Sequence, residues 1–71
     1  MPYEELLKVL NKFANITPGE SSDALDYIFV AGEIEDLYSQ YLDAKASSNK
    51  ELMTEIGQMI SAKVQMFCER I

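Results

Sequence analysis

The sequence lacks several residue types on which common enzyme chemistries depend. Its 71 residues include no histidine, no tryptophan and a single cysteine, Cys68. A Cys–His catalytic pair and a Cys/His metal site both need histidine or further cysteines, so both kinds of site are excluded. A single cysteine forms no internal disulfide, and a domain of this size without disulfides is typical of a reducing compartment. We therefore predict a cytoplasmic protein without a metal or cofactor.

Cationic residues and long apolar runs are also scarce. Six Lys and Arg stand against twelve Asp and Glu, which gives a net charge of −6. Direct nucleic-acid binding is not expected, because the few cations form no cluster that could neutralise phosphates. The longest apolar run, residues 27–31, is far shorter than the roughly 20 residues of a membrane-spanning helix. Residues 2–5 also do not fit the cationic start of a signal peptide, so we expect neither membrane insertion nor secretion.

Glycine and proline, with three and two residues, are too few to divide the chain into many short strands. Apolar residues instead recur at intervals of three and four, which predicts helices over about 2–15, 22–46 and 49–71. The sequence therefore predicts a single all-α domain over residues 1–71. We expect the two long helices to form an antiparallel hairpin and the short first helix to pack across one end, as in a three-helix bundle.

Polar residues mark the boundaries between the predicted helices. Ser21 or Ser22 is the expected N-cap of the second helix, after a cluster of turn-forming residues. Residues 47–49 interrupt the helical periodicity of the second helix. Ser48 followed by Glu51 has the spacing of a capping box, which predicts that the third helix begins at Ser48.

Two glycines fall inside the predicted helices. Gly32 costs about 1 kcal/mol relative to alanine at such a position. It either permits close approach of another backbone or marks a bend, and we favour the close approach. Gly57 and Ser61 have the spacing of a pair of small residues one turn apart, which in a water-soluble helix we interpret as local packing or chance and not as a membrane dimer motif.

The first half of the second predicted helix is apolar on more than one side. Leu25, Ile28 and Phe29 lie away from the main apolar seam, and a single layer of neighbours cannot cover both faces. Either the first helix covers this second face or a partner does. On the third helix, Met53, Met59 and Met66 widen the apolar stripe, and methionine serves both as core filler and at adaptable interfaces. The residues that we predict to bind a partner are Leu25, Ile28, Phe29, Met53 and Met59.

An acidic stripe is predicted on the second helix. Glu33, Asp36 and Asp43, with Gln40 between them, follow one another at intervals of three and four, which places them on one face. None has a Lys or Arg four residues further on. Such a stripe commonly keeps a small protein soluble. Alternatively, it is an anionic ridge that docks on a basic protein surface, so the three carboxylates join the predicted partner-binding residues.

One short motif resembles a known family. The segment Ser39-Gln40-Tyr41-Leu42-Asp43 is similar to the Ser-Gln-x-Leu-Asp motif of the sporulation-type aspartyl-phosphate phosphatases, which are small helical hairpins. In that family the motif acts on phospho-aspartate in response regulators. The resemblance covers five residues and implies that Gln40 and Asp43 are site residues. Here the motif falls near the end of a long helix, whereas in the family it lies soon after the interhelical loop.

The function that these observations favour is a non-enzymatic protein-interaction module: a small regulator, inhibitor, adaptor or co-chaperone. Carboxylates on a solvated helix face have no cleft that would separate their pKa values, so we predict no catalytic residue. The partner is another protein or a second copy in a homodimer, because two long helices expose more apolar surface than a short third helix covers. The alternatives are the phosphatase and an acidic mimic that blocks a nucleic-acid-binding protein.

Overall fold

The protein is all-α in the part of the chain that the structure describes. A computed structural model describes the backbone of residues 2–17, 19 and 21–70 and the side chains of residues 2–17, 19 and 23–69. Its helices are α1 (Tyr3–Ala14), α2 (Ser21–Ala46) and α3 (Lys50–Arg70), and these residues contain no strand. The predicted all-α class is confirmed. The three helices pack together in a molecule that measures 40 × 17 × 15 Å.

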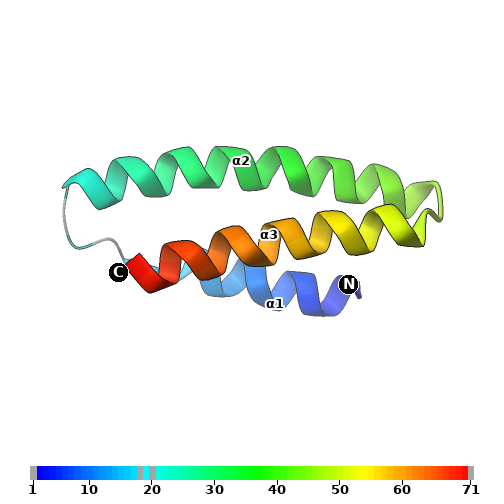
Figure 1. The fold of residues 1–71 in the computed structure, drawn as a ribbon, viewed down its shortest axis with the longest axis horizontal. Helices are drawn as coiled ribbons and strands as arrows, with labels where there is room; N and C mark the ends of the chain where they lie inside the picture. The colour runs from blue at the N-terminus through cyan, green and yellow to red at the C-terminus, as the bar shows by residue number, and fades with distance from the viewer. Residues whose placement is uncertain (1, 18, 20, 71) are drawn as a thin grey trace.

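The short helix α1 lies lengthwise on the other two helices (Figure 1). Its acidic first turn, with Glu4 and Glu5, complements the positive end of the helix dipole. The carbonyl of Pro2 accepts a hydrogen bond from the backbone amide of Leu6 at 3.1 Å, so Pro2 caps the helix. The expectation that α1 crosses one end of the long helices is wrong, because its first turn contacts the second half of α2 and its last turn contacts the first half.

Helix α1 lies closer to α3 than to α2. Cα atoms of α1 and α3 come within 8 Å of one another, whereas no described Cα atoms of α1 and α2 do. On α3, Gly57 is buried and Ser61 half-buried, in agreement with their interpretation as local packing residues. The wider gap between α1 and α2 is instead bridged by large aromatic side chains.

The hydrophobic core runs along the whole molecule and draws on all three helices. Its members recur at the helical spacing that the sequence predicted. Full burial of one large aliphatic or aromatic side chain stabilises a fold by about 1.5–3 kcal/mol. The buried apolar side chains are Leu6, Phe13, Ile34, Leu37, Tyr41, Ala44, Ile56, Ile60, Val64 and Phe67.

One end of this core is an aromatic cluster with a ring from each helix. Phe13 of α1 stacks on Tyr27 of α2 with ring centroids 4.6 Å apart and planes 4° apart. Phe67 of α3 meets both rings edge-on, at 5.8 Å and 5.7 Å. The Tyr27 hydroxyl also donates a hydrogen bond to the Phe13 carbonyl at 3.2 Å. This cluster therefore fixes the C-terminal end of α1 to both long helices.

A tyrosine group holds the other end of α1. The hydroxyls of Tyr3 and Tyr38 are hydrogen-bonded at 2.9 Å, and the Lys45 ammonium lies 3.7 Å from the centre of the Tyr3 ring. The hydrogen bond to Tyr3 raises the pKa of Tyr38, and burial raises the pKa of Tyr41, above the ordinary tyrosine value. Both shifts of the pKa favour the neutral phenol in the folded protein.

The turn between α2 and α3 follows a Schellman motif. The Asn49 amide bonds to the Ala44 carbonyl at 2.9 Å and the Ser48 amide to the Lys45 carbonyl at 3.1 Å. Ser48 has a φ of 57°, in the left-handed region. The Asn49 side-chain oxygen then accepts a hydrogen bond from the Leu52 amide at 3.2 Å. The predicted capping box at Ser48 is therefore wrong, because Ser48 is the left-handed turn residue that follows α2 and Asn49 caps α3.

This geometry predicts opposite effects for two neighbouring substitutions. Ser48→Gly should raise the free energy of unfolding by about 1 kcal/mol, because glycine adopts the left-handed conformation without steric cost. Asn49→Ala should lower it by about 1 kcal/mol through loss of the cap. Urea unfolding followed by circular dichroism measures both. Ser47→Gly is the control, since Ser47 has no positive φ to relieve; equal destabilisation by glycine at 47 and 48 would contradict this account of the turn.

Candidate functional site

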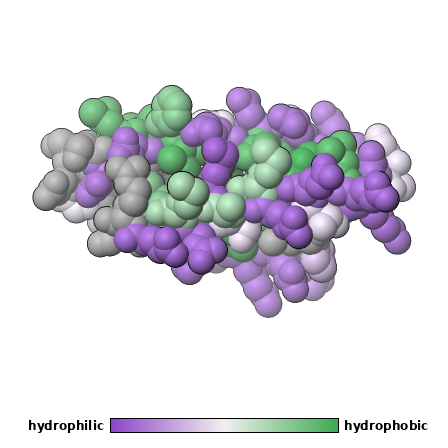
Figure 2. Space-filling model, viewed as in Figure 1, coloured by the Kyte–Doolittle hydropathy of each residue, from purple (hydrophilic) through white to green (hydrophobic). Residues whose placement is uncertain are grey.

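The most prominent surface feature is an apolar patch on the first half of α2, formed by Leu25, Ile28 and Phe29. These side chains are 69%, 68% and 70% exposed, although they are among the most hydrophobic residues of the chain. Figure 2 shows hydrophobic side chains gathered over the N-terminal part of α2 and mostly hydrophilic ones around them. A contiguous exposed apolar patch on a small protein is typical of an interaction surface.

No part of the described chain covers this apolar patch. Tyr27, Val30 and Ala31, from the same stretch of α2, pack against the core, where α1 and α3 lie. Helix α1 thus occupies the opposite side of α2 from the patch. The alternative that the first helix covers the second apolar face is wrong, and the three residues predicted to bind a partner remain accessible.

Gly32 lies beside the apolar patch, three residues after Phe29. The helix continues through it without interruption, so it marks no break in α2. A Cβ atom placed on Gly32 would have no heavy atom within 4 Å. The close approach of another backbone, which we favoured, therefore does not come from any described element of this chain. Glycine at this position lowers the stability by about 1 kcal/mol relative to alanine. No contact within the described chain requires a glycine here.

The acidic stripe continues the outer surface of α2 beyond Gly32, but one of its members is engaged elsewhere. Asp36 and Asp43 are exposed. Glu33 is half-buried, and its carboxylate accepts a hydrogen bond from the ammonium of Lys63 on α3 at 2.7 Å. The spacing of charges within α2 could not indicate this partner, because Lys63 belongs to the neighbouring helix. The free part of the stripe is thus Asp36 and Asp43.

The methionines have different environments. Met53 is half-buried and packs against the core, whereas Met59 is 50% exposed. Met66, which belongs to the same predicted stripe but is not among the predicted partner-binding residues, is 66% exposed. Together with Val30, Phe67 and the Glu33–Lys63 pair it lines a shallow hollow of about 170 Å³ between α2 and α3. Met66 lies seven residues after the exposed Met59 and off the buried line of Ile56, Ile60 and Val64, so helical spacing was the signal for its exposure.

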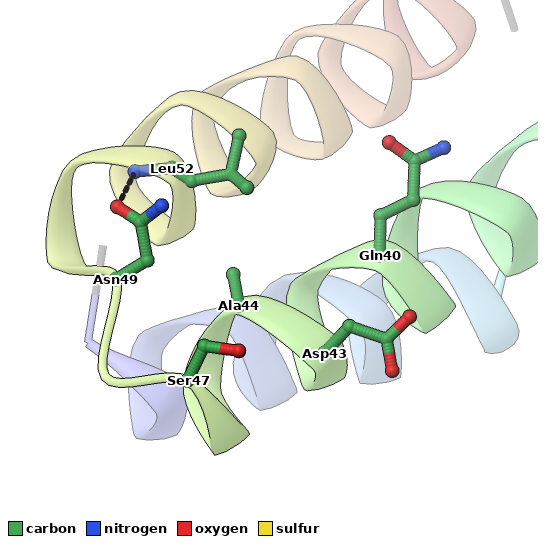
Figure 3. A pocket seen from close by; sticks show the side chains of 6 residues that line it. All are labelled: Gln40, Asp43, Ala44, Ser47, Asn49 and Leu52. Atoms are coloured by element: carbon green, nitrogen blue, oxygen red, sulfur yellow. Dashed lines mark hydrogen bonds between the residues drawn. The ribbon is translucent and has the colours of Figure 1, made fainter.

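A second hollow, of about 290 Å³, lies where α2 ends and α3 begins (Figure 3). Gln40 and Leu52 project towards it from the two helices, and Asp43 lies at its edge, one turn after Gln40. The two residues implied by the phosphatase resemblance therefore share one open site, while Tyr41 between them is completely buried. The hollow is also lined by Ala44, Ser47 and Asn49.

Comparisons with known proteins give no family assignment. No protein-family model matches the chain, and neither a curated protein nor a solved structure is significantly similar to it. In the described part of the chain, no helix combines the length and the apolar character needed to cross a bilayer. No three acidic or cysteine residues among those described come together as a metal-binding group.

Proposed function

We propose that the protein is a non-enzymatic interaction module that docks on a protein partner through the outer face of α2. The observation that carries this proposal is the exposure of Leu25, Ile28 and Phe29, each about 70%, on one contiguous surface. A chain with this acidic composition has ample polar residues for its surface. Keeping three large apolar side chains in water costs solubility, and docking removes that cost.

The size of the apolar patch limits the affinity that it can provide. Complete burial of such a side chain contributes about 1.5–3 kcal/mol, so three of them supply less than about 10 kcal/mol in total. Association itself costs at least about 4 kcal/mol, whereas a micromolar complex requires about 8 kcal/mol net. The apolar patch by itself therefore supports weak binding. A stable complex draws on neighbouring groups as well, and the face continues beyond Gly32 into Asp36 and Asp43.

Capture of partners from a lysate of the native host tests the proposal. The wild-type protein, Phe29→Glu and Gln58→Glu serve as baits. Gln58→Glu adds the same charge at an exposed polar position of α3 and is the matched control. We expect the same proteins to be retained by the wild type and the control and lost from Phe29→Glu. Capture that does not differ among the three baits would reject the outer face of α2 as the docking surface.

If the protein forms the predicted homodimer, we expect the two copies to associate through the same apolar patch. Sedimentation of the wild type and of Phe29→Glu at micromolar concentration distinguishes the two occupants. A dimer that Phe29→Glu dissociates identifies a second copy as the occupant. A monomer leaves the apolar patch available to another protein.

A phospho-aspartate phosphatase is the second candidate, because Gln40 and Asp43 line one open hollow. The test is the lifetime of a phosphorylated receiver domain with and without the protein. Dephosphorylation that Asp43→Asn abolishes would establish this activity, and an unchanged lifetime would reject it.

The acidic-mimic alternative now depends on Asp36 and Asp43, since Glu33 is paired with Lys63. Salt-sensitive competition with DNA for a basic protein would support it.

A further inference from the structure

We infer that the partner of the outer α2 face is an amphipathic helix that carries apolar side chains along one half of its contact face and lysine or arginine along the other half. This inference rests on the proposed function and specifies its partner. It follows from the order of residues along α2, from the open backbone at Gly32 and from the distribution of charge.

The outer face of α2 is one continuous strip with two chemically different halves. Leu25, Phe29, Gly32, Asp36 and Asp43 follow one another at intervals of three, four and seven residues, so they lie in one line along the helix. From Leu25 to Asp43 the strip is about 27 Å long at about 1.5 Å per residue. All of these positions are exposed. A long, narrow strip of this kind matches the contact face of another helix better than a compact surface does.

Gly32 lies where the apolar half passes into the acidic half. The absence of a side chain there leaves the α2 backbone bare, with no atom of the described chain near the position of a Cβ. A helix that crosses at this point can bring a large side chain, or its own backbone, into contact with α2. The glycine thus has a use in the complex that it does not have in the free protein.

The charge of the acidic half selects a cationic partner. Among the described residues, no Lys or Arg lies within 4 Å of Asp36 or Asp43, and Lys63 is already paired with Glu33. A second copy fits this half poorly, because it brings another net charge of −6 and another acidic strip. An anionic membrane surface is disfavoured for the same reason. Lysine or arginine on a partner helix complements both carboxylates.

Synthetic peptides of about 20 residues, long enough to span the strip, test the inference. The probe carries Leu at helical spacing in one half and Lys on the same face in the other, and it is made in both chain directions. Its controls replace Lys by Glu or scramble the order. Fluorescence anisotropy of labelled peptides gives the dissociation constant at low and high salt. We expect one direction of the Leu/Lys peptide to bind and the Glu peptide not to bind.

Three variants locate the binding on the strip. The double variant Asp36→Asn, Asp43→Asn should weaken binding about tenfold at low salt and reduce its salt dependence. Glu55→Gln, Glu69→Gln removes the same charge from exposed positions of α3 and should leave binding unchanged. Gly32→Gln should weaken binding about tenfold although it stabilises the helix, because it fills the open backbone position. Circular dichroism verifies that all of them fold.

The outcomes separate this inference from the proposed function. Peptide binding that Phe29→Glu abolishes but the double Asn variant leaves unchanged overturns the charge assignment and leaves the docking surface in place. Failure of both peptide directions, while host capture still depends on Phe29, overturns the inference alone. A dimer that Phe29→Glu dissociates, or binding to phosphatidylcholine vesicles that depends on Phe29, also overturns it, because the occupant is then a second copy or a lipid surface.

Discussion

Phe13→Ala should lower the free energy of unfolding by about 3–5 kcal/mol, a large effect for a single substitution. Phe13 is only 6% exposed, stacks on Tyr27 and meets Phe67 edge-on. Its truncation leaves a cavity and removes two aromatic contacts, each of which adds about 0.5–1.5 kcal/mol. A chain of this size has little stability beyond that amount. Chemical and thermal unfolding, followed by circular dichroism, measure the loss.

Leu7→Ala on the same helix is the control for Phe13→Ala. Leu7 is 43% exposed, so its truncation removes less buried surface and should cost less than about 1 kcal/mol. Both substitutions place alanine, the strongest helix former, in α1. Phenylalanine is a poorer helix former than leucine, so helix propensity alone would favour Phe13→Ala, and a larger loss in this variant reports packing. Equal effects of the two substitutions would show that α1 does not depend on the aromatic cluster for its attachment.

Phe29→Glu should raise the dissociation constant for the partner by about 100-fold or more, while the free energy of unfolding stays nearly unchanged. Central aromatic residues of an interface commonly contribute about 2–4 kcal/mol to binding, and a tenfold change corresponds to about 1.4 kcal/mol. In the free protein the ring is 70% exposed, so folding gains little from it. Titration calorimetry with the captured partner and thermal unfolding of the variant measure the two quantities.

The matched variant Gln58→Glu separates the two effects of Phe29→Glu, loss of the ring and gain of a charge. Added negative charge by itself attracts a partner that carries lysine and arginine, and Gln58→Glu adds its charge on α3 away from the strip, so it should change the dissociation constant only slightly. Phe29→Gln removes the ring without adding charge, and it should lose most of the affinity that Phe29→Glu loses. A dissociation constant that stays unchanged in Phe29→Gln would show that the ring does not contact the partner.

The helices could be predicted from the sequence because their determinants are local. The intervals of three and four among apolar residues from Tyr27 to Ala44 mark one buried face, and those residues do pack inward. Likewise, the exposure of Leu25, Ile28 and Phe29 follows from their positions off that face, once α1 is known to lie on the other side. The place of α1 could not be deduced, because it depends on contacts between residues far apart in the sequence, such as Tyr3 with Tyr38.

Two features of the candidate site show where local reasoning ends. The partner of Glu33 is Lys63, thirty residues away in the chain, and only the packing of α2 against α3 brings them together. Conversely, Ser48 and Glu51 have the sequence spacing of a capping box, yet the left-handed φ of Ser48 leaves the cap to Asn49. Helix packing decides the partner of Glu33, and backbone geometry decides which residue caps α3.

The distribution of aromatic residues gives the protein a built-in optical reporter. It has four tyrosines and no tryptophan, so tyrosine dominates its intrinsic fluorescence and the aromatic region of its circular dichroism spectrum. Tyr3 and Tyr38 are hydrogen-bonded to each other, Tyr41 lies 6.3 Å from Tyr3, and Tyr27 is stacked on Phe13. Every tyrosine thus takes part in a contact between α1 and α2. Near-ultraviolet spectra therefore follow the docking of α1 without any attached label, while far-ultraviolet spectra follow helix content.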